Sequence, residues 1–264
     1  MITLGIDIGS TTSKCVLMKD GSEILATSLY NGGIGTGSPE KALADVLSSG
    51  GIGMSDVSCS AVTGYGRSSF KGADLQISEL SCHALGGRFV FPELRTIIDI
   101  GGQDAKVIAL SENGKMVNFL MNDKCAAGTG RFLEVMANVL QLKIGDLETV
   151  AARSENPAKI SSTCTVFAES EVISQLANGV AIPDIVAGIC ESVAARTAAL
   201  ARRVGVVEQV CMSGGVALNG GVRRALERAL GVEIAFSPLS QLFGAIGAAL
   251  FAYSKIKAGP EKEK

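Results

Sequence analysis

The sequence predicts an α/β fold with two duplicated lobes, and an internal repeat is the main evidence for it. An apolar run ends in Asp7-Ile8-Gly9, and the same pattern recurs at Asp99-Ile100-Gly101. Each copy is followed by a second apolar run, as in a β-hairpin. Strand-like and helix-like segments then alternate along the chain, which is typical of α/β lobes. We place the lobes at residues 1–95 and 96–264 and expect the last helix to pack back on the first lobe.

The individual elements follow from the periodicity of apolar residues and from turn and capping residues. In the first lobe the sequence predicts strands at residues 4–9, 14–18, 23–29 and 57–63, and a helix at residues 39–48. In the second lobe it predicts strands at residues 96–102, 105–110, 116–121, 209–213 and 232–236. Helices are predicted at residues 129–140, 184–204, 219–230 and 239–256, with residues 141–200 largely helical.

The composition narrows the class of protein. Hydrophobic residues make up 47% of the 264 residues and charged residues 19%, with a net charge of −2, so we expect a folded chain that binds no nucleic acid. Glycine, serine and charged residues interrupt the apolar stretches before the roughly 18 residues that a membrane span needs. We therefore expect no membrane segment and no signal peptide. An odd number of cysteines, 7, argues against a disulfide framework and favours the cytoplasm.

Four glycine-rich turns predict a phosphate-binding site. They are Gly9-Ser10-Thr11-Thr12, Gly101-Gly102, Gly128-Thr129-Gly130 and Gly214-Gly215. Such turns present backbone N–H groups, and a helix start adds its dipole. Asp7 and Asp99 beside them offer carboxylates of the kind that hold Mg²⁺. We therefore expect a nucleotide cleft between the lobes, without a Walker P-loop or a Rossmann motif. The alternative is that these glycines only form tight turns.

Two cysteines, Cys125 and Cys164, each precede a predicted helix, and neither has a CxxC partner. Two thiolates cannot complete a four-ligand metal site, whereas a symmetric dimer would supply four. The alternative is that both are structural thiols near helix caps. Cys82, next to the single histidine, and Cys190 also remain possible ligands. Cys15, Cys59 and Cys211 lie in apolar strand-like runs and are expected to be buried.

Three segments resemble the activator component of 2-hydroxyacyl-CoA dehydratases, a group related to the ATPase subunits of benzoyl-CoA reductase. They are Ile98–Lys106, Met121–Glu134 and Ser161–Glu171, and the resemblance extends over residues 4–253. The paired Asp-x-Gly hairpins are also similar to those of actin, sugar kinases and the heat-shock chaperone ATPase domain. The resemblance implies that fold, with two lobes around a nucleotide cleft.

The resemblance also implies a function. It implies a homodimer with one 4Fe-4S cluster, held by Cys125 and Cys164 of each subunit, and binding of ATP, ADP and Mg²⁺. ATP hydrolysis would drive an electron onto a separate dehydratase component, and ferredoxin or flavodoxin would re-reduce the activator. Asp7 and Asp99 would hold Mg²⁺.

The remaining implied roles concern the nucleotide. Gln103 and Asp104 would position the attacking water or sense the γ-phosphate, and Lys14 would either contact phosphate or be solvated. The implied phosphate contacts are Ser10, Thr11, Thr12, Gly101, Gly102, Gly128, Thr129 and Gly130. The implied contacts to the nucleoside are Gly214, Gly215 and Glu134.

Two other functions remain open on the same fold. A sugar or small-molecule kinase would need a substrate pocket with a dedicated base, but neither Cys125 nor Cys164. A regulatory or chaperone-like ATPase would bind ATP without a metal cluster. Iron content separates both from the activator.

Overall fold

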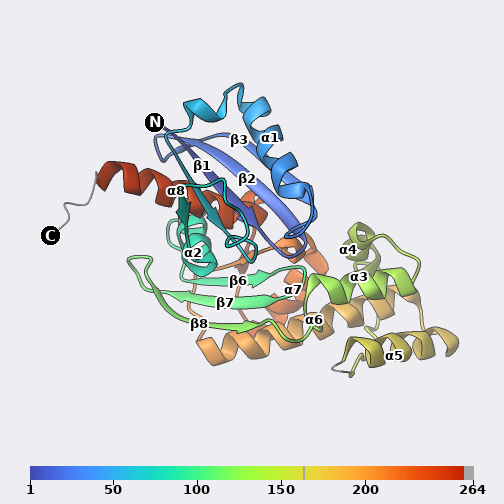
Figure 1. The fold of residues 1–264 in the computed structure, drawn as a ribbon. Coiled ribbons are helices and arrows are strands. Elements are labelled where there is room, and N and C mark those ends of the chain that lie inside the picture. The colour runs from blue at the N-terminus through green and yellow to red at the C-terminus, as the bar shows by residue number, and fades with distance from the viewer. Residues whose placement is uncertain (163, 259–264) are drawn as a thin grey trace. The chain divides into compact units, whose positions relative to one another are not determined.

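The computed structural model describes residues 1–162 and 164–258, which form two compact units. One unit comprises Met1–Glu93 together with the described residues from Gln241 onward, and the other comprises Leu94–Ser240. Each unit is built on a five-stranded mixed sheet with helices packed against it (Figure 1). The predicted α/β class with two duplicated lobes is therefore confirmed.

The sheet of the first unit has the order β3-β2-β1-β4-β5. Its strands are β1 (Ile2–Ile8), β2 (Thr12–Lys19), β3 (Glu23–Asn31), β4 (Cys59–Thr63) and β5 (Leu75–Gln76). The central strand β1 pairs antiparallel with β2 and parallel with β4. Because it is covered on both faces, β1 is apolar almost throughout, and Leu4 and Ile6 are fully buried.

The sheet of the second unit repeats this topology. Its strands are β6 (Thr96–Ile100), β7 (Ala105–Leu110), β8 (Met116–Asn122), β9 (Val210–Ser213) and β10 (Ile234–Ala235). They have the order β8-β7-β6-β9-β10, in which β6 pairs antiparallel with β7 and parallel with β9. The internal repeat in the sequence thus corresponds to a repeat in topology. Every predicted strand is present, and the short β5 is additional to them.

The described part of the first unit contains three α-helices. They are α1 (Ser38–Gly50), α2 (Glu79–Val90) and α8 (Phe243–Ala258). α8 packs on β1, β4 and α2. The close approach depends on glycine, because a Cβ atom at Gly5, Gly86 or Gly247 would overlap the backbone of the neighbouring element. The α2 helix is additional to the predicted elements.

The helical segment that contains α8 is strongly apolar. The segment Pro238–Ala258 is long and apolar enough to cross a membrane by length and composition alone. However, 56% of its 18-residue apolar stretch is buried inside the structure, and Ile246, Ala249 and Ala252 are fully buried. Gly244, Gly247 and Ser254 interrupt its apolar run, as the sequence led us to expect, and the segment is apolar because it is a core helix.

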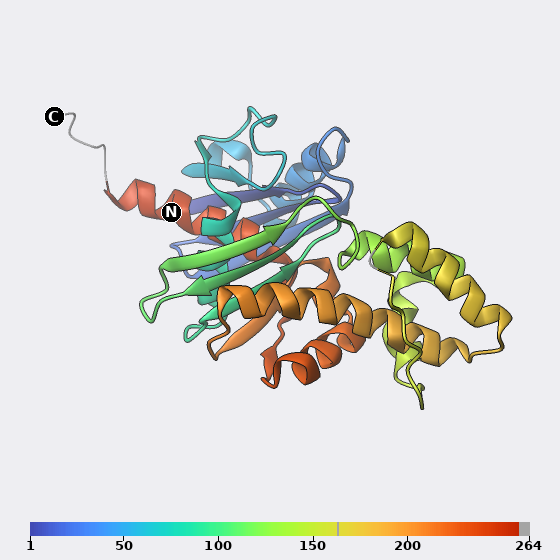
Figure 2. The same ribbon diagram turned by 90° about the horizontal axis from the view of Figure 1, so that it is seen from below.

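The second unit has its helices on one face and at one end of the sheet. They are α3 (Gly130–Val139), α4 (Leu147–Ala151), α5 (Thr165–Ala177), α6 (Ile182–Val204) and α7 (Gly220–Leu230). α6 contacts α7 and covers β7 and β8 (Figure 2). The helices α3, α4 and α5 pack around the N-terminal half of α6, beyond the end of the sheet (Figures 1 and 2). One apolar core, which includes Phe132, Ile189 and Val107, joins these helices to the sheet.

The packing of α8 gives a test of the first unit. We expect Gly247→Ala to lower the free energy of unfolding by about 1–3 kcal/mol, because the new methyl group would overlap the backbone of Cys82 in α2. Urea denaturation measures this difference. The matched control is Gly37→Ala, whose Cβ would meet no atom within 4 Å. Equal stability of the two variants would contradict the packing argument.

Candidate functional site

A buried carboxylate lies near the end of β1. Asp7 is only 3% exposed, and Lys14 is its partner in the β1–β2 register. The Lys14 Nζ donates to Asp7 Oδ2 at 3.0 Å. A buried charge needs such a partner, since removing it from water is costly. Lys14 was expected either to contact phosphate or to be solvated. The structure shows it paired with Asp7 and only 12% exposed, so the solvated alternative is wrong.

The second unit carries the same pair. Asp99 is 2% exposed and lies opposite Lys106, whose Nζ is 3.3 Å from Asp99 Oδ2. Lys106 Nζ also lies 2.6 Å from Asp104 Oδ2, and the Ser213 hydroxyl donates to Asp99 Oδ1 at 2.8 Å. Asp104 is therefore tied to a lysine that was not predicted. The signal was present, because both Asp–Lys pairs have the same spacing of 7 residues.

A glycine in a left-handed conformation lies against each buried carboxylate. Gly64 follows β4 with a φ of 89°, and Gly214 follows β9 with a φ of 80°. A Cβ at Gly64 would overlap Asp7 Oδ1, and a Cβ at Gly214 would lie 2.9 Å from Asp99 Oδ1. Glycine at both positions therefore leaves room beside the carboxylate. Gly64 was not among the predicted site residues.

The two hairpin turns also match. The Gly9 N–H donates to Thr12 O at 2.9 Å, and the Gly101 N–H donates to Asp104 O at 2.9 Å. The residues between these bonds form the tips of the turns. In the first turn these are Ser10 and Thr11, and in the second they are Gly102 and Gln103. Thr11 and Gln103 are exposed, so both turns present polar groups next to a buried carboxylate.

The start of α3 packs on the second of these turns. The Gly130 N–H donates to Gly101 O at 2.9 Å, and the Arg131 N–H donates to Gly102 O at 2.8 Å. The structure thus brings together two turns that the sequence predicted separately. The Gly130 amide holds the helix start in place and does not offer a donor to a ligand. Thr129 is buried, and its hydroxyl donates to Ala126 O at 2.6 Å.

Gly215 and Glu134, which were predicted to contact the nucleoside, lie in different surroundings. Gly215 begins a 3₁₀ turn, Gly215–Leu218, directly after Gly214. Glu134 lies on an exposed part of α3, where its carboxylate pairs with Arg131 at 2.8 Å. The structure therefore does not bring Glu134 next to the buried carboxylate of its unit through any described bond.

The seven cysteines fall into two groups. Cys125 and Cys164 are exposed, and the other five are buried. Burial raises the pKa of Cys15, Cys82 and Cys190 to about 12, and it also raises the pKa of Cys59 and Cys211. Since thiolate is the form that binds metal, Cys82 and Cys190 are poor ligands. The two exposed thiols are the ones that the resemblance selects.

Cys164 lies at the N-terminus of α5, as expected. The two serines before it are held by Glu171, which accepts hydrogen bonds at 2.9 Å from the N–H groups of Ser161 and Ser162 and from the Ser161 hydroxyl. Burial acts to raise the pKa of Glu171, but these hydrogen bonds outweigh it and lower the pKa to about 2. Glu171 therefore fixes the backbone that leads to Cys164.

Cys125 lies in the loop between β8 and α3, five residues before the helix begins, and so not at the helix start. Asn122 closes this loop. Its Oδ1 accepts the Cys125 N–H at 3.3 Å, and its Nδ2 donates to Cys125 O at 3.0 Å. A single side chain thus sets the conformation of the loop that carries the exposed thiol.

Arg196 of α6 connects both cysteine segments. Its guanidinium donates to Ser162 O, two residues before Cys164, and lies over the Phe132 ring at 5.3 Å from the centroid. Burial lowers the pKa of Arg196, and negative charge at Cys125 opposes this shift. Nothing in an Ala-rich helix sequence distinguishes this arginine, so only the structure shows its position.

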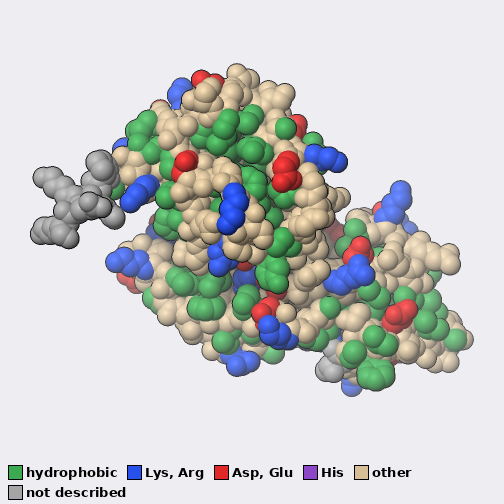
Figure 3. Space-filling view, in the orientation of Figure 1, with side chains coloured by type: hydrophobic (Ala, Val, Ile, Leu, Met, Phe, Trp, Pro, Cys, Tyr) green, Lys and Arg blue, Asp and Glu red, His purple; other side chains and the backbone are tan. Residues whose placement is uncertain are grey.

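An apolar surface lies beside Cys164. Val166, Phe167 and Ile173 on α5 are 66%, 68% and 51% exposed. Figure 3 shows hydrophobic side chains gathered over this helix. Exposed apolar patches of this kind mark interaction surfaces in soluble proteins.

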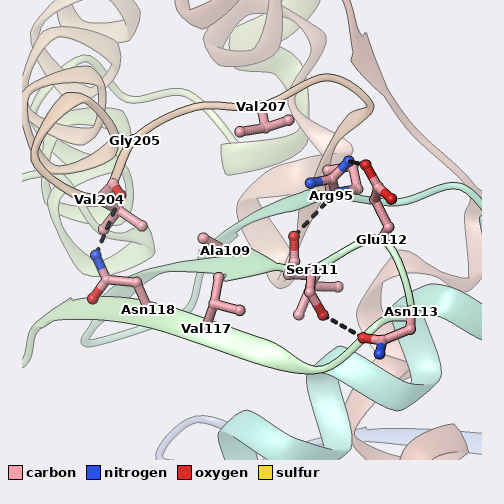
Figure 4. A pocket seen from close by; sticks show the side chains of 11 residues that line it. Arg95, Ala109, Ser111, Glu112, Asn113, Val117, Asn118, Val204, Gly205 and Val207 are labelled. Atoms are coloured by element: carbon pink, nitrogen blue, oxygen red, sulfur yellow. Dashed lines mark hydrogen bonds and ion pairs between the residues drawn. The ribbon is translucent and has the colours of Figure 1, made fainter.

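A separate hollow of about 650 Å³ lies in the second unit, between the β7–β8 hairpin and the C-terminal end of α6 (Figure 4). Two of the polar side chains that line it are bonded to the backbone of the same unit. Arg95 Nε donates to Leu110 O at 3.1 Å, and Asn118 Nδ2 donates to Val204 O at 3.2 Å. No predicted site residue lines this hollow, so we do not assign the function to it.

Comparison with known proteins agrees with the fold. The model of the BadF/BadG/BcrA/BcrD ATPase family matches residues 4–252. The chain therefore belongs to this ATPase family.

Its relatives include activators of 2-hydroxyacyl-CoA dehydratases, which confirms the resemblance seen in the sequence. The (R)-2-hydroxyglutaryl-CoA dehydratase activating ATPase of Acidaminococcus fermentans is 59% identical, covering 96% of this chain and 97% of the relative. The crystal structure of component A of that dehydratase has a TM-score of 0.95, with 58% identity over 97% of this chain and 99% of the other. The structure of the activator of 2-hydroxyisocaproyl-CoA dehydratase from Clostridium difficile with bound ADPNP has a TM-score of 0.96, with 52% identity over 100% of this chain and 98% of the other.

The role of Glu171 can be tested by hydrogen–deuterium exchange. We expect Glu171→Gln to speed amide exchange at Ser161 and Ser162 by roughly tenfold, because the charged acceptor is lost. Since its pKa is lowered from 4.5 to about 2, the carboxylate stabilises this segment above pH 4.5, and the effect is lost as the pH falls toward 2. Rates are corrected for the intrinsic dependence of exchange on pH.

The matched control is Glu169→Gln on the same helix, since the Glu169 carboxylate makes no hydrogen bond or ion pair with a described residue. If the two variants exchanged equally fast at Ser161 and Ser162, Glu171 would not be holding this segment.

Proposed function

We propose that this chain is the ATP-dependent activator of a 2-hydroxyacyl-CoA dehydratase. The observation that carries the proposal is the placement of two exposed thiols, out of seven, in the unit that also has the Asp99 hairpin. The start of α3 packs on the Asp99 hairpin turn, and the Cys125 loop leads directly into α3. The names of the relatives support the same function.

The nucleotide would be bound by the paired hairpins. Asp7 and Asp99 are proposed to hold Mg²⁺, directly or through water, because they are carboxylates fixed at the mouths of glycine turns. The ADPNP bound to a relative of 52% identity supports a nucleotide site in this fold. Gln103, exposed at its turn, and Asp104 are proposed to position the attacking water. The proposed nucleotide contacts are Ser10, Thr11, Thr12, Gly101, Gly102, Gly128, Gly214, Gly215 and Glu134, with Thr129 and Gly130 fixing the turn.

The thiols fit a metal cluster shared by two copies of the chain. Each copy offers two exposed sulfurs, Cys125 and Cys164, so a dimer would supply the four that a 4Fe-4S cluster requires. The start of α5 at Cys164 favours negative charge. The exposed apolar face of α5 beside Cys164 provides a surface for the second copy. Such a cluster, when bound, accepts and passes on one electron.

This chain would hydrolyse ATP to drive the electron transfer, and it would not itself react with the acyl-CoA substrate. ATP hydrolysis would drive the transfer of the electron to the dehydratase component, which would bind the 2-hydroxyacyl-CoA. Ferredoxin or flavodoxin would return an electron to the activator. Exposed thiols of this kind call for a reducing compartment such as the cytoplasm.

The test is to measure iron and acid-labile sulfide in protein purified without oxygen. We expect about four of each per dimer. Cys125→Ser should lose the iron and keep binding ADPNP, because Cys125 lies outside the hairpin turns. The control is Cys59→Ala, which alters a buried thiol in the first unit and should keep the iron.

Two results would overturn the assignment. Iron-free native protein that still binds ADPNP would favour the kinase or regulatory ATPase. Full iron occupancy in Cys125→Ser would show that this cysteine is not a ligand.

A further inference from the structure

The proposed function assigns no role to Arg196. It lies in the middle of α6, a helix of 23 residues whose inner face is buried. From there its side chain reaches three segments of the second unit: the Gly128 turn, α3 at Phe132, and the Ser162 backbone. No other described hydrogen bond or ring contact joins these three segments through one side chain.

The contact with the turn is close. A Cβ at Gly128 would lie 3.4 Å from Arg196 Cβ and 3.6 Å from Arg196 Cδ, so the stem of the arginine lines the backbone of the turn. Gly128 has a φ of 89°, a conformation that other residues rarely adopt. A displacement of this turn would therefore press on the arginine or release it.

The two terminal nitrogens of the Arg196 guanidinium differ in their hydrogen bonding. One terminal nitrogen donates to Ser162 O. The other, Nη1, is buried and has no hydrogen-bond partner within residues 1–162 and 164–258. An unmet buried donor is costly, so an arrangement that brings a carbonyl to Nη1 would be favoured. The side chain is therefore suited to two alternative arrangements, as a switching element requires.

We propose that Arg196 is a positioning residue that transmits nucleotide occupancy at the Gly128–Gly130 turn to the segment that leads to Cys164. This inference rests on the proposed function, because it assumes that the turn responds to a nucleotide. Arginine suits the role better than lysine, since its planar fork lies over Phe132 and carries a second terminal nitrogen that is able to donate in another direction. Glu171 fixes the same segment from the side of α5 and does not contact the turn.

The experiment is hydrogen–deuterium exchange of the purified dimer with and without saturating Mg²⁺ and ADPNP. In the native protein we expect the nucleotide to change exchange at residues 122–128 and at residues 160–164, by roughly fivefold or more. In Arg196→Gln the response at 122–128 should remain, whereas the response at 160–164 should disappear. Arg196→Lys should recover it only in part.

Controls separate this coupling from a structural role. Arg203→Gln, on the exposed side of the same helix, should respond like the native protein. Glu171→Gln should exchange faster at 160–164 in both states but keep its response to ADPNP. Calorimetry should show an ADPNP affinity for Arg196→Gln that is close to the native value, which also shows that the variant is folded.

The outcomes distinguish this inference from the proposed function. A full response at 160–164 in Arg196→Gln, or no response there in the native protein, overturns the inference. An Arg196-dependent response in protein that contains no iron upholds it and contradicts the cluster. Failure of the native protein to bind ADPNP overturns both.

Discussion

A buried carboxylate held opposite a lysine across a β-hairpin is the interaction on which the rest of the site depends. It occurs twice, as Asp7 with Lys14 and as Asp99 with Lys106. Each pair holds two strands in register and places a carboxylate next to a glycine-rich turn. A buried ion pair is a weak source of stability in itself, but breaking one partner leaves an uncompensated charge. The positive-φ glycines and the packing of α3 on the second turn are arranged around this constraint.

The second unit adds a route from that hairpin to the exposed thiols. The turn at Gly101-Gly102 accepts the first amides of α3, and the loop before α3 carries Cys125. Arg196 joins this region to the backbone before Cys164. A change at the turn therefore has a short physical path to both thiols, through hydrogen bonds and packed side chains within one unit. The first unit has the equivalent hairpin but no exposed cysteine.

Much of the fold was predictable because apolar periodicity and turn residues mark strands directly, and the repeat of Asp7-Ile8-Gly9 at Asp99-Ile100-Gly101 indicated the duplication. α2 escaped prediction because Gly86 and Gly87 weaken its helical signal, although packing against α8 requires a small residue at Gly86.

Residues of the candidate site that belong to a sequence motif were predictable. Residues that are positioned by tertiary contacts were not. The pairing of Lys106 with both Asp99 and Asp104 depends on strand register, and the use of the Gly130 amide depends on how a helix start meets a turn. No local sequence pattern around Arg196 indicates its contacts. Sequence selected the two cysteines by resemblance, whereas their exposure among five buried thiols is a property of the fold.

The most direct test of the central claim is the effect of Mg²⁺ on ADPNP affinity, measured by titration calorimetry on the native protein and on Asp99→Asn. If the buried carboxylates serve nucleotide chemistry, Mg²⁺ will tighten ADPNP binding to the native protein, and Asp99→Asn will lose most of that gain while staying folded. An Asp99→Asn variant that keeps the full gain would show that this carboxylate only supports the hairpin, and would contradict the account.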